Sequence, residues 1–127
     1  MEIKIILVED EKIIALLLNK VLEKRGYPVF KTFDTADDAV IYVNENKVDV
    51  VLMDIYLKGN LNGIEAAKQI NQISGAIIIY ITANAESAAK EQALQTRHFG
   101  YFEKPLSDVE IDEICEIINS NFNKWSV

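Results

Sequence analysis

Five short apolar runs alternate along the chain with five segments whose apolar residues recur at helical spacing. The third and fourth runs are almost continuously hydrophobic, as expected for strands that are covered on both faces. The predicted strands are Ile3–Val8, Val29–Phe33, Val48–Asp54, Ala76–Thr82 and Gly100–Glu103. Because a helical segment follows each strand, the pattern predicts an α/β protein with a doubly wound parallel sheet.

The segments between the strands have the apolar stripes of amphipathic helices. The first stripe leads to Gly26, a residue suited to the left-handed turn that ends many helices. Thr35 is the predicted N-cap of the second helix, and residues 107–110, with sequence SDVE, form a capping box that begins the last. The fourth helix, expected at about residues 85–96, has the weakest pattern of the five.

Composition limits the classes of function that fit the chain. Its 127 residues match the size of one domain, and half of them are hydrophobic, which is enough for a substantial core. The formal net charge of −7 and the lack of a basic stripe argue against direct nucleic-acid binding. No apolar stretch reaches the length of a membrane span. Since Cys115 is the single cysteine, we expect a cytoplasmic, reducing environment.

Charged residues stand at the carboxyl ends of three predicted strands. Glu9 and Asp10 follow the first, Asp54 ends the third, and Lys104 follows the fifth. The carboxyl ends of the strands in an open parallel sheet lie along one edge, and ligands bind at that edge. Three carboxylates and an amine at this edge indicate a site for a divalent cation and a phosphoryl group.

Each of these residues, taken singly, also fits a structural role. Glu9 and Asp10 would favour the N-terminus of the following helix. Thr82 is an ordinary β-branched residue at the end of a strand, and Lys104 fits a solvated loop. All of these roles would have to hold together to remove the site, so their combination favours chemistry.

The chain resembles the receiver domain of two-component response regulators. The resemblance covers residues 1–122, leaving 123–127 as a C-terminal tail, and rests on the order and spacing of Glu9-Asp10, Asp54, Thr82, Tyr101 and Lys104-Pro105. It implies a flavodoxin-like (βα)5 sandwich whose five-stranded parallel sheet has the order 2-1-3-4-5. It also implies a phosphorylation-dependent signalling switch, which catalyses only its own phosphorylation and slow autodephosphorylation and has no external substrate.

The resemblance gives each site residue an expected role. Asp54 would be the phosphoacceptor. Mg²⁺, or Mn²⁺ in its place, would be bound directly by Asp10 and Asp54, and directly or through water by Glu9. The backbone carbonyl oxygen of Tyr56 would complete the protein ligands. Lys104 would pair with a phosphoryl oxygen, and the peptide bond between this lysine and the following proline would be cis.

The resemblance also implies how the signal leaves the site. Thr82 would donate a hydrogen bond to the phosphoryl group, and Tyr101 would turn toward the vacated space, changing the face formed by the fourth helix, fifth strand and fifth helix. A histidine kinase or phosphotransfer protein would supply the phosphoryl group. The changed face would contact a downstream protein, a covalently attached output domain or, weakly, a second copy. Tyr56 and Asn84 would flank the approach of water and tune dephosphorylation.

Three other functions are alternatives. A flavodoxin-like electron carrier shares the sheet order, but it needs a phosphate-binding loop where this chain has the acids of residues 9–11. A hydrolase that forms an aspartyl phosphate usually has a second acid two residues after the nucleophile, where this chain has Tyr56. The third alternative is a receiver-like interaction module that works without phosphorylation.

Overall fold

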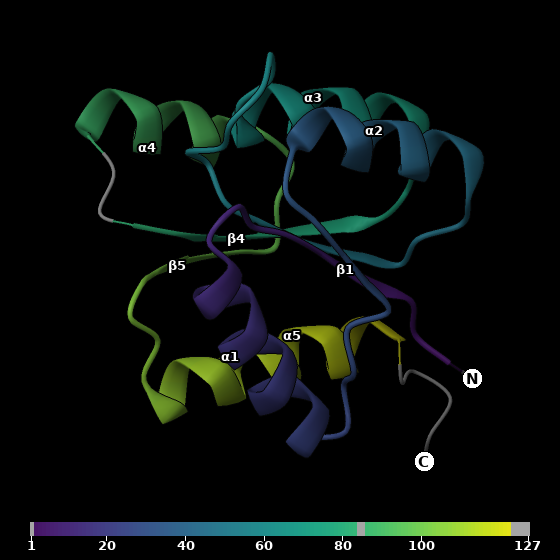
Figure 1. Cartoon of the computed structure of the whole chain (residues 1–127), viewed down its shortest axis with the longest axis vertical. Coiled ribbons are helices and arrows are strands. Elements are labelled where there is room, and N and C mark those ends of the chain that lie inside the picture. Colours follow the sequence, from purple (N-terminus) through teal and green to yellow (C-terminus); the bar gives the residue numbers. More distant parts are fainter. Residues whose placement is uncertain (1, 84–85, 123–127) are drawn as a thin grey trace.

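The computed structural model describes residues 2–83 and 86–122, which form one parallel sheet between two layers of helices (Figure 1). Neighbouring strands are parallel throughout and lie in the order β2-β1-β3-β4-β5. The predicted fold class and strand order are therefore confirmed. The strands are β1 Ile5–Val8, β2 Lys31–Phe33, β3 Val50–Met53, β4 Ile77–Thr82 and β5 Gly100–Glu103.

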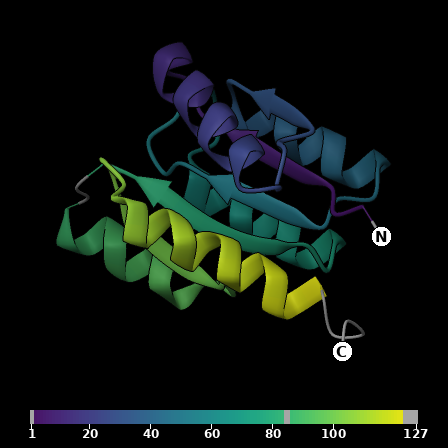
Figure 2. The same ribbon diagram turned by 90° about the horizontal axis from the view of Figure 1, so that it is seen from below.

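Helices cover both faces of this sheet. The helices are α1 Lys12–Lys24, α2 Ala36–Glu45, α3 Gly63–Ile73, α4 Ser87–Gln95 and α5 Asp108–Phe122. Helices α1 and α5 pack on one face, and α2, α3 and α4 on the other (Figures 1 and 2). This two-sided cover explains why β1, β3 and β4 are buried at every position. None of the described helices is long and apolar enough to cross a membrane.

Capping side chains determine where several helices begin. Thr35 accepts a hydrogen bond from the backbone N–H three residues on, and Ser107 and Glu110 form the box at the start of α5, both as the sequence predicts. A further box, in which Asn62 and Glu65 exchange hydrogen bonds, begins α3. This box was not predicted, although its Asn-x-x-Glu signal is present in the sequence.

Several element boundaries differ from the sequence prediction. The first four strands begin one or two residues later than expected. Just before β1, the backbone N–H of Lys4 donates to the side chain of Asp49 at 2.8 Å and not to a backbone carbonyl of a neighbouring strand. Strand β3 ends at Met53, so Asp54 lies just beyond it, although its N–H still bonds to the carbonyl of Val8. The phosphoacceptor candidate therefore stands at the mouth of the sheet.

Gly63 allows α3 to begin directly against the end of β3. Its N–H donates to the carbonyl oxygen of Ile55 at 2.8 Å. A Cβ atom at this position would lie 1.9 Å from the carbonyl oxygen of Asp54, which belongs to rigid backbone. Only glycine fits this contact, so Gly63 fixes the position of the segment that presents Asp54.

We expect Gly63→Ala to lower the free energy of unfolding by about 3 kcal/mol, because relieving the clash must displace backbone at the end of β3. Chemical denaturation followed by circular dichroism would measure the loss. Gly75→Ala is the matched control, since nothing lies within 4 Å of its added Cβ. Equal stability of the two variants would contradict this account of the contact.

Candidate functional site

Three carboxylates meet at the carboxyl ends of β1 and β3. Glu9, Asp10 and Asp54 each offer one oxygen, and these oxygens lie within 4.8 Å of one another. Glu9 and Asp54 are buried, whereas Asp10 is partly exposed. Closely spaced carboxylate oxygens are the ligands that Mg²⁺ prefers. The cluster therefore fits a divalent cation of this type.

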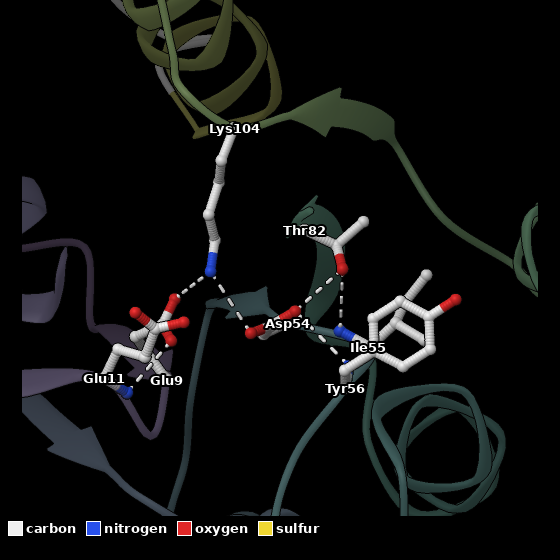
Figure 3. A network of polar contacts seen from close by, with 7 residues as sticks. All are labelled: Glu9, Glu11, Asp54, Ile55, Tyr56, Thr82 and Lys104. Carbon is white, nitrogen blue, oxygen red and sulfur yellow. Dashed lines mark hydrogen bonds and ion pairs between the residues drawn. The ribbon is translucent and has the colours of Figure 1, made fainter. Parts of the chain in front are cut away.

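Lys104 reaches this cluster from the end of β5 (Figure 3). Its Nζ lies 2.5 Å from Oε1 of Glu9 and 3.2 Å from Oδ2 of Asp54. The peptide bond between Lys104 and Pro105 is cis, the geometry that the family resemblance implies. One ammonium among three carboxylates leaves two formal negative charges, and these would attract a cation.

In both Lys104 and Glu9, burial and the pairing of the two side chains shift the pKa in opposite directions. Burial raises the pKa of Glu9, and the hydrogen bonds from Lys104 and from the N–H of Glu11 offset this only in part. Burial alone would lower the pKa of Lys104. The hydrogen bond to Glu9 and the charges of Asp54 and Glu9 outweigh it, so the pKa of the lysine is raised. Lys104 is therefore a fixed positive charge at neutral pH.

Both oxygens of the Asp54 carboxylate are held by donors. Oδ1 accepts hydrogen bonds from the Thr82 hydroxyl at 2.7 Å and from the Tyr56 N–H at 3.3 Å, while Oδ2 faces Lys104 (Figure 3). Thr82 lies at the end of β4, is fully buried, and also accepts the Ile55 N–H at 3.4 Å. The carboxylate is thus oriented by Thr82 at the end of β4, by Lys104 directly after β5, and by the backbone of its own loop.

Tyr56 borders the site but points its hydroxyl away from Asp54 (Figure 3). The side chain is about half exposed, and its hydroxyl accepts a hydrogen bond from the N–H of Glu86 at 3.3 Å. Glu86 is the N-cap residue of α4. Asn84, the other residue predicted to tune dephosphorylation, lies outside the described residues, as does the predicted C-terminal tail.

Tyr101 lies on β5 beside Tyr80 of β4, with ring centroids 6.1 Å apart. Its ring is partly buried, and Lys90 of α4 places its Nζ 5.3 Å from the ring centroid. The Tyr101 hydroxyl is buried and has no hydrogen-bond partner in the part of the chain that the structure describes. By contrast, the Tyr80 hydroxyl bonds to Thr96 at 2.7 Å. No sequence motif pointed to Tyr80, Lys90 or Glu86, because each contributes through tertiary contacts.

The chain is similar to known proteins in both sequence and structure. The sequence model of the family described as response regulator receiver domain matches residues 5–117 of the chain. In sequence, the chain is 34% identical over 107 residues to the transcriptional regulatory protein YvrH of Bacillus subtilis (strain 168). This match covers 84% of the chain but only 45% of that protein, so the chain spans less than half the length of this relative.

Two solved structures are similar over almost their whole length. The signal receiver domain of a modulated diguanylate cyclase from Desulfovibrio desulfuricans G20 is 30% identical, with a TM-score of 0.82 and coverage of 93% of this chain and 94% of the other. The N-terminal domain of a response regulator/sensory box/GGDEF 3-domain protein from Carboxydothermus hydrogenoformans is 31% identical, with a TM-score of 0.82 and coverage of 94% and 96%. Because the family match spans most of the chain and relatives at 30% identity or more share its fold, this chain belongs to the response regulator receiver domains of two-component systems.

Proposed function

We propose that this receiver domain is a phosphorylation-dependent switch whose phosphoacceptor is Asp54. The observation that supports the proposal most directly is the set of contacts to its carboxylate, in which Thr82 holds one oxygen and Lys104 the other. A residue that merely ended a strand would not need two oriented donors from separate elements. The neighbouring acids Glu9 and Asp10 add the negative charge that a cation site requires.

The proposed transfer is a displacement at phosphorus. A carboxylate oxygen of Asp54 attacks the phosphorus of a phosphohistidine on a histidine kinase or phosphotransfer protein. The O–P bond forms as the P–N bond breaks, and the electron pair of that bond stays on the imidazole nitrogen. Lys104 then pairs with one phosphoryl oxygen and the Thr82 hydroxyl donates to another. Both groups already lie within hydrogen-bond distance of Asp54, so little reorganisation is needed.

Three carboxylates and an incoming phosphoryl group repel one another, and Mg²⁺, or Mn²⁺ in its place, neutralises part of this charge when it is bound. Asp10 and Asp54 would be direct ligands. Glu9 would bind directly or through water, since Lys104 already contacts it. The backbone carbonyl of Tyr56 would complete the set. The chain would thus promote its own phosphorylation and slow dephosphorylation, in the cytoplasm, without acting on another substrate.

The proposed output is a population shift on the face formed by α4, β5 and α5. A phosphoryl oxygen that engages Thr82 replaces its present contact with Asp54. This change favours one position of Tyr101 over another and alters the surface that a downstream protein, an attached output domain or a second copy would contact. The Tyr101 hydroxyl is buried and finds no hydrogen-bond partner among the described residues, so its present position is not fixed by a polar contact there.

A phosphodonor protein must dock beside the edge that bears Asp54, and α1 offers an apolar surface there. Ile13, Leu16 and Leu17 are all more than half exposed. Leu17 also borders a groove of about 490 Å³ that contains Lys104 itself. The apolar residues of the groove are Ile14, Leu17, Leu18, Val21, Ile81, Ala83, Pro105, Leu106 and Ile111. A partner seated on this groove would bring its phosphohistidine close to the site.

We expect one phosphoryl group to be added to the wild-type chain by a small phosphodonor in the presence of Mg²⁺, because Asp54 is the oriented nucleophile. Intact-mass measurement would detect it, and Asp54→Asn should abolish it. Asp49→Asn, an acid before β3 at the other end of that strand, is the matched control and should retain it. A modification that persists in Asp54→Asn would show that another residue accepts the group.

We expect Asp10→Ala to weaken Mg²⁺ binding roughly tenfold or more, because a site with so few protein ligands loses one of them. A Mg²⁺ titration followed by NMR would measure the affinity. Asp34→Ala, which removes an exposed acid next to β2, controls for the general loss of negative charge. Equal weakening in both variants would mean that Asp10 acts through charge alone and is not a ligand.

We expect the phosphorylated chain to lose its phosphoryl group several-fold faster in Tyr56→Asn than in the wild type. The phenol ring excludes water and supplies no carboxylate that could act as a general base. Decay would be followed by intact mass with Mg²⁺ and without kinase. Tyr56→Phe, which keeps the ring, should decay more slowly than Tyr56→Asn. Decay in Tyr56→Asn as slow as in the wild type would refute shielding.

A further inference from the structure

Helix α4 is weakly anchored compared with its neighbours. Ala93 is the one buried residue within the helix. Its N-cap residue, Glu86, makes no side-chain capping bond, whereas α2 and α3 each begin with one. A helix with so little buried surface is held by the few polar contacts at its ends and along its inner face, so each of those contacts has a large influence on its position.

One of these contacts comes from the phosphoacceptor loop, the segment between β3 and α3 that contains Asp54 and Tyr56. Tyr56 donates its backbone N–H to Oδ1 of Asp54 at 3.3 Å, and its side-chain oxygen accepts the N–H of Glu86 at 3.3 Å. A single residue therefore touches the carboxylate with its backbone and the start of α4 with its side chain. Figure 3 shows the phenol hydroxyl on the side of the ring away from Asp54.

The start of α4 is connected in turn to β5. The carbonyl of Glu86 accepts the N–H of Lys90, one turn further along the helix, at 3.0 Å. The Lys90 ammonium lies 3.8 Å from the carboxylate of Glu103 and 5.3 Å from the ring centroid of Tyr101. A displacement of Glu86 would therefore move the Lys90 ammonium relative to the Tyr101 ring. Thr82 meets this chain of contacts only at Asp54, where its hydroxyl bonds to the same oxygen as the Tyr56 N–H, and at the N–H of Ile55.

We propose that Tyr56 is a positioning residue that ties the start of α4 to the phosphoacceptor loop, so that the state of Asp54 reaches Lys90 and Tyr101 by a route independent of Thr82. This inference rests on the proposed function of Asp54. A phosphoryl group adds oxygens that compete for the Tyr56 N–H, so the loop must adjust, and the hydroxyl transmits the adjustment to Glu86. A hydrogen bond of ordinary strength shifts a two-state population roughly two- to tenfold.

The first experiment tests the tie in the unphosphorylated chain and does not depend on phosphorylation. Tyr56→Phe removes the hydroxyl and keeps the ring. We expect hydrogen exchange at the Glu86 and Lys90 amides, followed by NMR, to become roughly two- to tenfold faster. Tyr42→Phe makes the same chemical change on α2 and should leave these amides unaffected. Unchanged exchange in Tyr56→Phe would overturn the inference.

The second experiment tests the independent route with beryllium fluoride and Mg²⁺ as the phosphoryl mimic. Amide shifts at Lys90 and Tyr101 would be compared at saturation in Thr82→Ala and in Thr82→Ala combined with Tyr56→Phe. We expect part of the wild-type response to survive in the single variant and to disappear in the double variant. Complete loss in the single variant, or an equal response in both, would overturn the route.

The two failures can be told apart. If the wild-type chain binds no mimic and gains no phosphoryl group at Asp54, the proposed function fails, whereas the exchange experiment on Glu86 still reports on the tie. If the mimic binds and the exchange rates do not respond to Tyr56→Phe, the proposed function of Asp54 is retained and the positioning role of Tyr56 is wrong.

Discussion

The ion pair between Lys104 and the acids at the mouth of the sheet is the interaction on which the rest of the site depends. The ammonium lies between Glu9 and Asp54, and both carboxylates are buried. Desolvating such a pair offsets most of its attraction, and leaving one partner buried alone generally costs about 3–5 kcal/mol. A cluster of this kind is a poor way to gain stability. Its persistence at a ligand-binding edge is better explained by the need to hold a charged group there.

The strand order makes that ion pair available. Glu9 and Asp54 are far apart in sequence but follow β1 and β3, which are neighbours in the sheet. Thr82 is the last residue of β4, and Lys104 follows β5, the neighbour of β4 in the sheet. In a doubly wound sheet of this order, successive strands are added first on one side of β1 and then on the other. Ligands bind in the crevice at this switch point, between β1 and β3. The site is therefore a consequence of topology together with the residue that ends each strand.

Much of this could be predicted from sequence, because strand ends and helix caps are local signals. The apolar runs located the edge, the acids and Lys104 marked it, and Thr35 showed where α2 begins. The order of the strands came from the family resemblance, since periodicity does not specify which strands are neighbours. The contact between Tyr56 and Glu86 could not be predicted, because it depends on where a loop side chain points and on how far a neighbouring helix leans over the sheet. The box at Asn62 had a local signal that was overlooked.

The contrast between a rigid pocket and a weakly held helix suits a switch. The residues around Asp54 lie among three fully buried strands and beside the close contact at Gly63, so a charge added there meets donors in tightly packed surroundings. Helix α4 has one buried residue among those the structure describes. It is held to its surroundings by the hydrogen bond from the Glu86 N–H to Tyr56 and by the contacts of Lys90 with Glu103 and Tyr101. Contacts of about 1 kcal/mol each are too weak to disturb the core, yet they are comparable with the free-energy difference between two positions of such a helix. In the proposed switch, a phosphoryl group on Asp54 would therefore leave the fold intact and still change the face formed by α4, β5 and α5.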